Sequence, residues 1–421
     1  MSNDYLTFDE FAHSILDPSQ QGHPHGRRSH FYTSSSPECR PNITLQETPD
    51  AKPQTSFPMR AHLSVIDSIT KRGIDLFFSH MYPIYPLLDE NQIRSRLLAP
   101  SEMDPTTTCL LFSLCAMTLV QVENWPDLST EQRAFHARRY IRQCQEIRIQ
   151  LNFVEEATFE DMLCSLFVGM TYFELKCRKA SWFYVREAIT LAHAIGLHTA
   201  SRDKSLSELE TLRRQRAYAL LFITERGAAV LDTFPVTILS PPSLPVDTIP
   251  GEDPAVSLGL GSLHHLFSLL DFNFVHIWND LEPQSSADRG YWQLARLQEH
   301  LRQKLQIQGV SDIQRADLSI TQQWLRLVFW QAALRLGLIS SSAADSAFTY
   351  HYPIEIATSL CEIVKGLPPA AIQVHGLGIV SDSTKPHSLY LLLLLLSPFH
   401  DLTDLSSSRN NSKSPTRSST P

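Results

Sequence analysis

The sequence predicts an all-α fold, an irregular multi-helix arrangement with proline-rich connections. The first observation is a helical stripe after Ser181, where apolar or small residues recur at steps of three and four. These residues are Trp182, Val185, Ile189, Ala192 and Gly196. The second is that residues 217–231 are apolar on almost every side, as in a buried helix. The third is that prolines fall between the helical runs, where they end helices.

Composition limits the class of protein. The chain has 421 residues, 43 % hydrophobic and 19 % charged, so it can bury a large core. Its formal net charge of −8 argues against nucleic-acid binding through bulk positive charge. Residues 1–17 carry acids and no basic region, so we expect no secretory signal. No apolar run approaches the roughly 20 residues that cross a bilayer, so no membrane partner is expected.

Residues 1–58 are predicted to be a disordered N-terminal segment, because serine, proline, glutamine and asparagine are dense there without periodicity. Four potential metal ligands lie in it: His23, His25, His30 and Cys39. Their spacing fits no familiar metal site, so we interpret them as a solvated loop.

The structured part is predicted to span residues 59–380. It begins with a helix over 66–80 that ends at the stretch Met81–Asp89. Two prolines in that stretch push the preceding tyrosines towards extended geometry, which predicts a rigid aromatic turn. A short helix follows over 90–97.

The next helices differ in character. Residues 106–122 are apolar on most faces and predict a buried helix. Ser129 and Gln132 form a capping-box pattern that opens a helix to about Gln150. Arginines gather on one side of this helix: Arg133, Arg138, Arg139, Arg142 and Arg148. They could face phosphates or an acidic partner, but a solvated helix face is the favoured interpretation.

Thr158 is the predicted N-cap of a further helix, with Asp161 in its first turn. The apolar face of that helix is rich in methionine and phenylalanine: Met162, Leu163, Leu166, Phe167, Met170 and Phe173. Such a stripe is typical of a core, although it could also line a small-molecule pocket.

The central helix pair is expected to end at Gly196 and before Pro235. A charged pair, Glu225 and Arg226, interrupts the apolar run of its second helix. Because a buried carboxylate is costly unless it is paired, Glu225 is expected to form a structural ion pair rather than a catalytic site.

The candidate partners of that carboxylate are Arg186 and Arg216, although it could instead face an adjacent helix. Two histidines of the same region, His193 and His198, are interpreted as packing or capping residues rather than ligands.

An extended, proline-rich crossing from Ser240 to Asp253 follows the central pair. Further helices are predicted at about 263–281, 291–307, 319–338 and 352–366. Residues 381–421 are predicted to be a low-complexity, disordered tail in which the leucine run 391–396 is too short to cross a membrane. One hypothesis is an altered or truncated C-terminus, and the other is a short helix followed by a tail.

No catalytic or metal site is predicted, and cofactor-binding residues stay unknown, with no cofactor expected. The seven cysteines are scattered without C-x2-C spacing, as is typical of reduced thiols inside helices. The sequence has no G-x-S-x-G elbow, H-E-x-x-H motif or P-loop. Glu155 and Glu156 are adjacent and would point apart on a helix. We therefore expect a protein that is not an enzyme.

Three stretches carry a resemblance to a known family. They are YPIYPLLD at 82–89, SWFYVREAITLAHAIGLH at 181–198 and RRQRAYALLFITERGAAVLDTFPVTIL at 213–239. Together they resemble the fungal-specific transcription factor domain, or middle homology region, of binuclear zinc-cluster regulators. Within that family, the stretches resemble the subclass of maltose- and starch-responsive activators and their relatives in secondary-metabolite clusters. The resemblance covers about residues 61–375 and implies an all-helical regulatory domain.

The zinc cluster of that family needs six closely spaced cysteines, whereas the N-terminal region of this sequence holds only Cys39. The resemblance therefore implies a nuclear transcriptional regulator that works through a DNA-bound transcription factor or a homologous full-length regulator. Its contact with promoter DNA could be indirect, and a small-molecule effector is a further candidate partner. The expected target is a pathway gene set such as a secondary-metabolite (toxin) cluster. Control of genes for carbon-source use is a comparably supported alternative. The alternative hypothesis is an effector-binding or sequestering helical protein, a repressor-like sensor without direct DNA binding.

Overall fold

The described part of the chain is all-α, as the sequence predicts. The computed structural model describes residues 66–371, apart from 100–102, 124, 200–205, 246, 280–286, 304, 306–307 and 369–370. Among these residues the regular elements are helices, and no β-strand occurs. The predicted disordered segment 1–58 and tail 381–421 lie outside the described residues, so the boundaries at 59 and 380 stay predictions.

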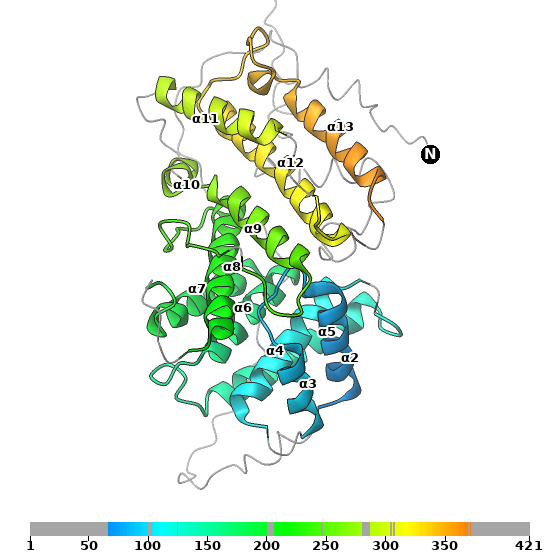
Figure 1. Cartoon of the computed structure of the whole chain (residues 1–421). Helices are drawn as coiled ribbons and strands as arrows, with labels where there is room; N and C mark the ends of the chain where they lie inside the picture. The colour runs from blue at the N-terminus through cyan, green and yellow to red at the C-terminus, as the bar shows by residue number, and fades with distance from the viewer. Residues whose placement is uncertain are drawn as a thin grey trace, which may run out of the picture.

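Two groups of helices are joined by a pair of connecting helices (Figure 1). The first group comprises α2 (Ser68–Leu76) with the π-helical turn Phe77–Met81, α3 (Glu90–Leu98), α4 (Pro105–Gln121), α5 (Thr130–Arg148), α6 (Phe159–Glu174) and α7 (Arg178–Ala194). The connecting helices are α8 (Glu208–Asp232) and α9 (Pro254–Ser268). The second group comprises α10 (Phe272–Asn279), α11 (Ala287–Arg302), α12 (Asp312–Arg335), the 3₁₀ turn Ser346–Phe348 and α13 (Tyr352–Lys365).

Helix α4 lies at the centre of the first group. Every residue from Thr107 to Gln121 is buried, because the helix is apolar or small on all sides and contacts α2, α5 and α6. Full burial of one leucine contributes about 2 kcal/mol to folding, so a helix enclosed in this way anchors the whole group. The predicted aromatic turn packs against it: Leu87 and Leu88 are buried, and Gln121 donates to the Tyr85 hydroxyl at 3.4 Å.

Side-chain caps determine where these helices begin. The predicted capping box of Ser129 and Gln132 opens α5, and Thr158 forms a second capping box with Asp161 at the start of α6. Helix α7 begins at Arg178. The chain reverses at Lys176, which has φ +61°.

The interpretation of the α5 arginines as one solvated face is wrong for two of them. Arg138, Arg139 and Arg142 are exposed. Arg133 is buried and donates to the main-chain oxygens of Leu119 and Val122, and Arg148 is buried in an ion pair with a glutamate of α7. Long arginine side chains reach hydrogen-bond acceptors on neighbouring elements, which a helix-face pattern does not show.

Helices α9, α10 and α12 begin at other residues than the sequence predicts. The helix predicted at 263–281 is two helices, α9 and α10, because the chain breaks at Asp271, whose carboxylate accepts the backbone N–H of Phe274. Helix α9 begins earlier, at Pro254, where Asp253 caps the first turn and proline occupies the first helical position. Helix α12 also begins earlier than predicted, behind a capping box of Ser311 and Gln314.

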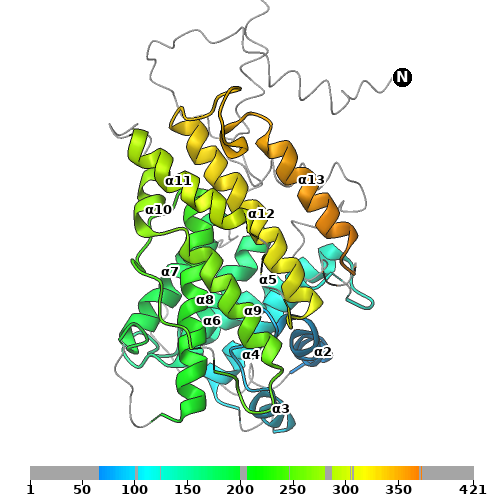
Figure 2. The ribbon, with the colours of Figure 1, turned by 45° about the horizontal axis from the view of Figure 1, so that its top comes forward.

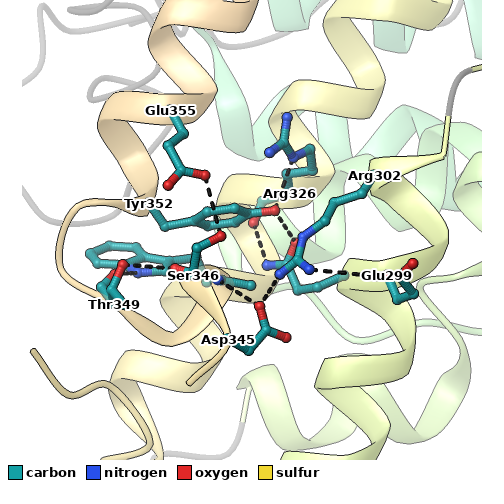
Figure 3. A network of polar contacts seen from close by, with 11 residues as sticks. Glu299, Arg302, Arg326, Asp345, Ser346, Thr349, Tyr352 and Glu355 are labelled. Carbon is teal, nitrogen blue, oxygen red and sulfur yellow. Dashed lines mark hydrogen bonds and ion pairs between the residues drawn. The ribbon is translucent and has the colours of Figure 1, made fainter. Parts of the chain in front are cut away.

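Helices α11, α12 and α13 lie side by side in the second group (Figures 1 and 2), and α12 contacts both of its neighbours and α9. A polar network holds this layer together (Figure 3). The Tyr352 hydroxyl accepts from Arg326 Nε and donates to Gln298 Oε1, both at 3.0 Å, and Arg302 pairs with Asp345. The network therefore links α11, α12, α13 and the turn before α13.

One hydrophobic cluster runs through both groups and the connecting helices. Among the described residues, no helix combines the length and apolar character needed to span a bilayer.

Candidate functional site

The charged pair Glu225 and Arg226, in the second half of α8, holds an extended segment against the helix. Glu225 is only 3 % exposed, and its oxygens accept the backbone N–H groups of Thr237 at 2.6 Å and Ile238 at 2.9 Å. Arg186 of α7 donates to the same carboxylate at 2.8 Å. Of the two candidate partners from the sequence, Arg186 is thus confirmed, whereas Arg216 lies elsewhere.

Arg226 completes this arrangement. It is fully buried and donates to the main-chain oxygens of Leu270 at 2.8 Å and Ile238 at 2.6 Å. Its guanidinium carbon lies 4.5 Å from the ring centroid of Phe222. Burial lowers the pKa of Arg226, and the charge of Glu225 opposes that shift. The pair has no open face for a substrate, so its role is to fix the segment after α8 and the end of α9.

The two histidines of the central pair lie together at the end of α7. Their ring centroids are 5.0 Å apart, and His193 Nε2 lies 3.1 Å from the Tyr218 hydroxyl oxygen. Burial lowers the pKa of His193, with the nearby His198 adding to the effect. The two rings pack against each other, and His193 also packs against the ring of Tyr218.

A polar cavity of about 420 Å³ lies where the first group of helices meets the connecting helices. Its walls come from the turn after α2 and from the starts of α3, α8, α9 and α12. A cavity of this size is at the lower end of the range for small-molecule sites. The methionine and phenylalanine stripe of α6 does not line this cavity, and its residues Met162 to Phe167 are buried in the core.

Glu252 joins residues from different elements of the cavity wall. Its carboxylate accepts from the Tyr82 hydroxyl at 2.7 Å and from Arg216 at 2.8 and 2.7 Å, and Arg216 also donates to Ser257 at 2.6 Å. Arg216 is only 1 % exposed, so this forked pair is a buried one. Burial and then the Glu252 hydrogen bond raise the pKa of Tyr82, which keeps the hydroxyl protonated as a donor.

A second pair faces the cavity from the other side. Arg213 of α8 donates to Asp89 Oδ2 at 2.7 Å, while the same carboxyl group caps α3 through the N–H of Gln92. Burial alone would raise the pKa of the Asp89 carboxyl group. The hydrogen bonds from Gln92 and Arg213 outweigh burial, so this pKa is lowered. Arg213 Nε is buried without a hydrogen-bond partner in the described structure. That N–H is an unsatisfied donor inside the wall, and solvent in the cavity does not reach it.

The charges of the cavity select against anions. Four helices begin at its wall, and a free helix N-terminus would favour a negative group. Here the first-turn N–H groups are already capped by Asp89, Asp253 and Ser311. The lining carboxylates also outnumber the lining arginine, so a neutral molecule with hydroxyl groups fits better than a phosphate.

Sequence reasoning missed this cavity, because its pairs join residues far apart in the chain. Tyr82 and Glu252 are separated by 170 positions. One local signal was present: the order glycine, acid, aspartate, proline at 251–254 is typical of a turn followed by a capped helix start.

Comparison with known proteins shows what part of the chain is similar to. Residues 74–241 match the family described as "Fungal specific transcription factor domain". That range includes Glu225, Arg226, Tyr82 and Arg213, whereas Glu252 lies beyond it. No solved structure matches the chain.

Curated relatives from two fungi match the chain at low identity. The chain is 24 % identical to the "Probable sucrose utilization protein SUC1" of Candida albicans, over 73 % of this chain and 61 % of the relative. It is 23 % identical to the "Maltose fermentation regulatory protein MAL13" of Saccharomyces cerevisiae, over 74 % of this chain and 65 % of the relative. It is 26 % identical to MAL33, a protein of the same description and organism, over 77 % of this chain and 69 % of the relative. The chain thus matches about three-fifths to two-thirds of the length of these relatives.

Proposed function

Because the chain carries a fungal specific transcription factor domain at residues 74–241, we propose that it is a non-enzymatic regulator of transcription. The single observation that carries the proposal is this match, which covers the central helix pair and the ion-pair residues that fix its end. The names of the relatives refer to sucrose utilization and maltose fermentation, and they support a gene set for carbon-source use. They lend no specific support to a secondary-metabolite cluster, which stays a sequence-based prediction.

The regulator acts in the nucleus through a partner, either a DNA-bound transcription factor or a homologous full-length regulator. The polar cavity is its effector site. A neutral, hydroxyl-rich molecule such as a carbon source matches the cavity's capped helix starts and the carboxylates of its wall. Occupancy changes the contacts among the first group, α8 and α9, because each of them supplies part of the wall.

Chromatin immunoprecipitation of a tagged copy at its native locus tests the regulatory role. The expected result is enrichment at a coherent set of promoters, including genes of carbon-source use. A protein that stays cytoplasmic without enrichment would contradict the proposal and favour the sequestering sensor.

The effector site is tested separately with Arg213→Gln and the matched variant Arg214→Gln. Arg214 is the next residue of α8 and pairs with Glu210 one turn away, outside the cavity. Arg213→Gln is expected to blunt the transcriptional response to the carbon source, while Arg214→Gln keeps it. Equal responses in the two variants would show that the cavity does not bind the effector, whether or not the chain occupies promoters.

A further inference from the structure

Two histidines from different helices point their ring nitrogens at each other on the surface of the molecule. His265 lies on α9 and His300 on α11, and their Nε2 atoms share a hydrogen bond of 3.0 Å, in which one ring donates its N–H and the other accepts. The ring centroids are 5.2 Å apart and the rings are inclined at 62°. Both side chains are exposed, so solvent and ions reach the space between them.

This separation is close to that of two imidazoles bound to one metal ion. Metal–nitrogen bonds of about 2.0–2.1 Å place two ligand nitrogens about 2.9 Å apart at a right angle and about 3.3 Å apart at a tetrahedral angle. The observed distance of 3.0 Å lies between these values. We propose that a divalent ion of the nickel, copper and zinc group binds between His265 and His300. The Nε2 proton that the two rings share is released to solvent, and both rings turn so that each Nε2 lone pair faces the ion.

The ligand type sets the class of ion. Neutral imidazole nitrogen suits Ni²⁺, Cu²⁺ and Zn²⁺, whereas Mg²⁺ and Ca²⁺ prefer oxygen. The nearest carboxylate along α11, Glu299, forms an ion pair with Arg302. No third side chain joins the two histidines in a larger ligand group among the described residues, so water completes the coordination. The site is consequently weaker and more readily exchanged than a structural site with four protein ligands.

A bound ion has a structural consequence that a solvent-exposed histidine alone would not have. It ties α9, which begins at the polar cavity, to α11 of the second group. An ion that binds the folded chain and not the unfolded chain raises the unfolding midpoint by mass action.

The test uses the full chain with an affinity tag that contains no histidine. Titration with NiCl₂ or ZnCl₂ is followed by calorimetry and by thermal melting. We expect the midpoint to rise by several degrees at saturating metal in the parent protein. His265→Gln and His300→Gln should each weaken the metal affinity by at least about tenfold, because the second ligand contributes as a chelate. His276→Gln, an exposed histidine of α10, should leave both readouts unchanged.

Three histidines of the N-terminal segment are controlled in the same way. A His23→Gln, His25→Gln, His30→Gln variant can lose metal ions in calorimetry, but it should keep the rise in the melting midpoint. Two nitrogen ligands in the electron paramagnetic resonance spectrum of the Cu²⁺ complex, reduced to one in His300→Gln, would support the site. A midpoint shift that survives in His265→Gln/His300→Gln, or no shift in the parent protein, would overturn the proposal.

Discussion

Replacing Glu225 by glutamine should destabilise the fold without altering a specific chemistry. The carboxylate accepts two backbone N–H groups with its two different oxygens, at 2.6 and 2.9 Å, while two arginines supply its positive partners. Glutamine has a single acceptor oxygen, so its NH₂ group must face a donor and one buried N–H loses its partner. Arg226, fully buried, loses its adjacent negative charge.

The size of the effect follows from these lost contacts. A hydrogen bond to a charged group contributes about 1.5–3 kcal/mol, and breaking a buried ion pair costs about 3–5 kcal/mol. We expect the free energy of unfolding to fall by about 3–5 kcal/mol. At about 2 °C per kcal/mol for a large domain, the melting midpoint should drop by roughly 6–10 °C.

Thermal and urea melts of Glu225→Gln measure this loss, with Glu146→Gln as the control. Glu146 is an exposed glutamate of α5, and its substitution should change stability by less than about 0.5 kcal/mol. A Glu225→Gln protein that melts with the parent but no longer occupies promoters would refute the structural role and assign the carboxylate a direct one.

Two further predictions concern α9. A Cβ on Gly259 would lie 2.1 Å from Gln314 Nε2, which donates to the main-chain oxygens of Pro83 and Val256. Gly259→Ala should therefore lower the free energy of unfolding by about 1–3 kcal/mol, measured in a urea melt. Gly261→Ala meets no atom within 4 Å and should stabilise by about 0.4–1 kcal/mol; equal effects of the two substitutions would contradict the packing argument. Burial lowers the pKa of His264, and the nearby His265 lowers it further. The folded state therefore binds fewer protons than the unfolded state. As a result, the free energy of unfolding falls as the pH drops from about 6.5 through the folded-state pKa. His264→Leu should flatten the pH dependence of the melting midpoint between about pH 7 and 5, and an unchanged slope would contradict the assignment.

Local patterns predicted the elements that local chemistry determines. The capping box at Ser129, the N-cap Thr158 and the helix end at Gly196 are set by residues within one turn, and the structure has each where the sequence indicated. The enclosed helix α4 was also predicted, since it is apolar on nearly all faces.

The start of α9 was missed because its glycines are poor helix formers when judged alone. In the folded chain Gly259 is needed for a tertiary reason, since the Gln314 side chain occupies the space beside its Cα. Arg216 was one of two candidate partners of Glu225, but it reaches Glu252 across the connection to α9. A sequence shows which buried charges need partners, but the choice among distant partners depends on the packing of whole helices.

Helix α8 connects the two polar clusters that the sequence could not relate. Arg213 and Arg216 in its first half hold the cavity wall, and Glu225 and Arg226 in its second half fix the end of α9 and the segment after α8. Because one continuous helix carries both, a displacement of its first half moves the second half as well. Yet a ligand shifts such an equilibrium only by its difference in affinity between the two arrangements. The proposed effector would therefore act through the contacts that differ between the two arrangements. The Arg213–Asp89 and Arg216–Glu252 pairs cross between elements of the wall, so they are the contacts that such a displacement would change first.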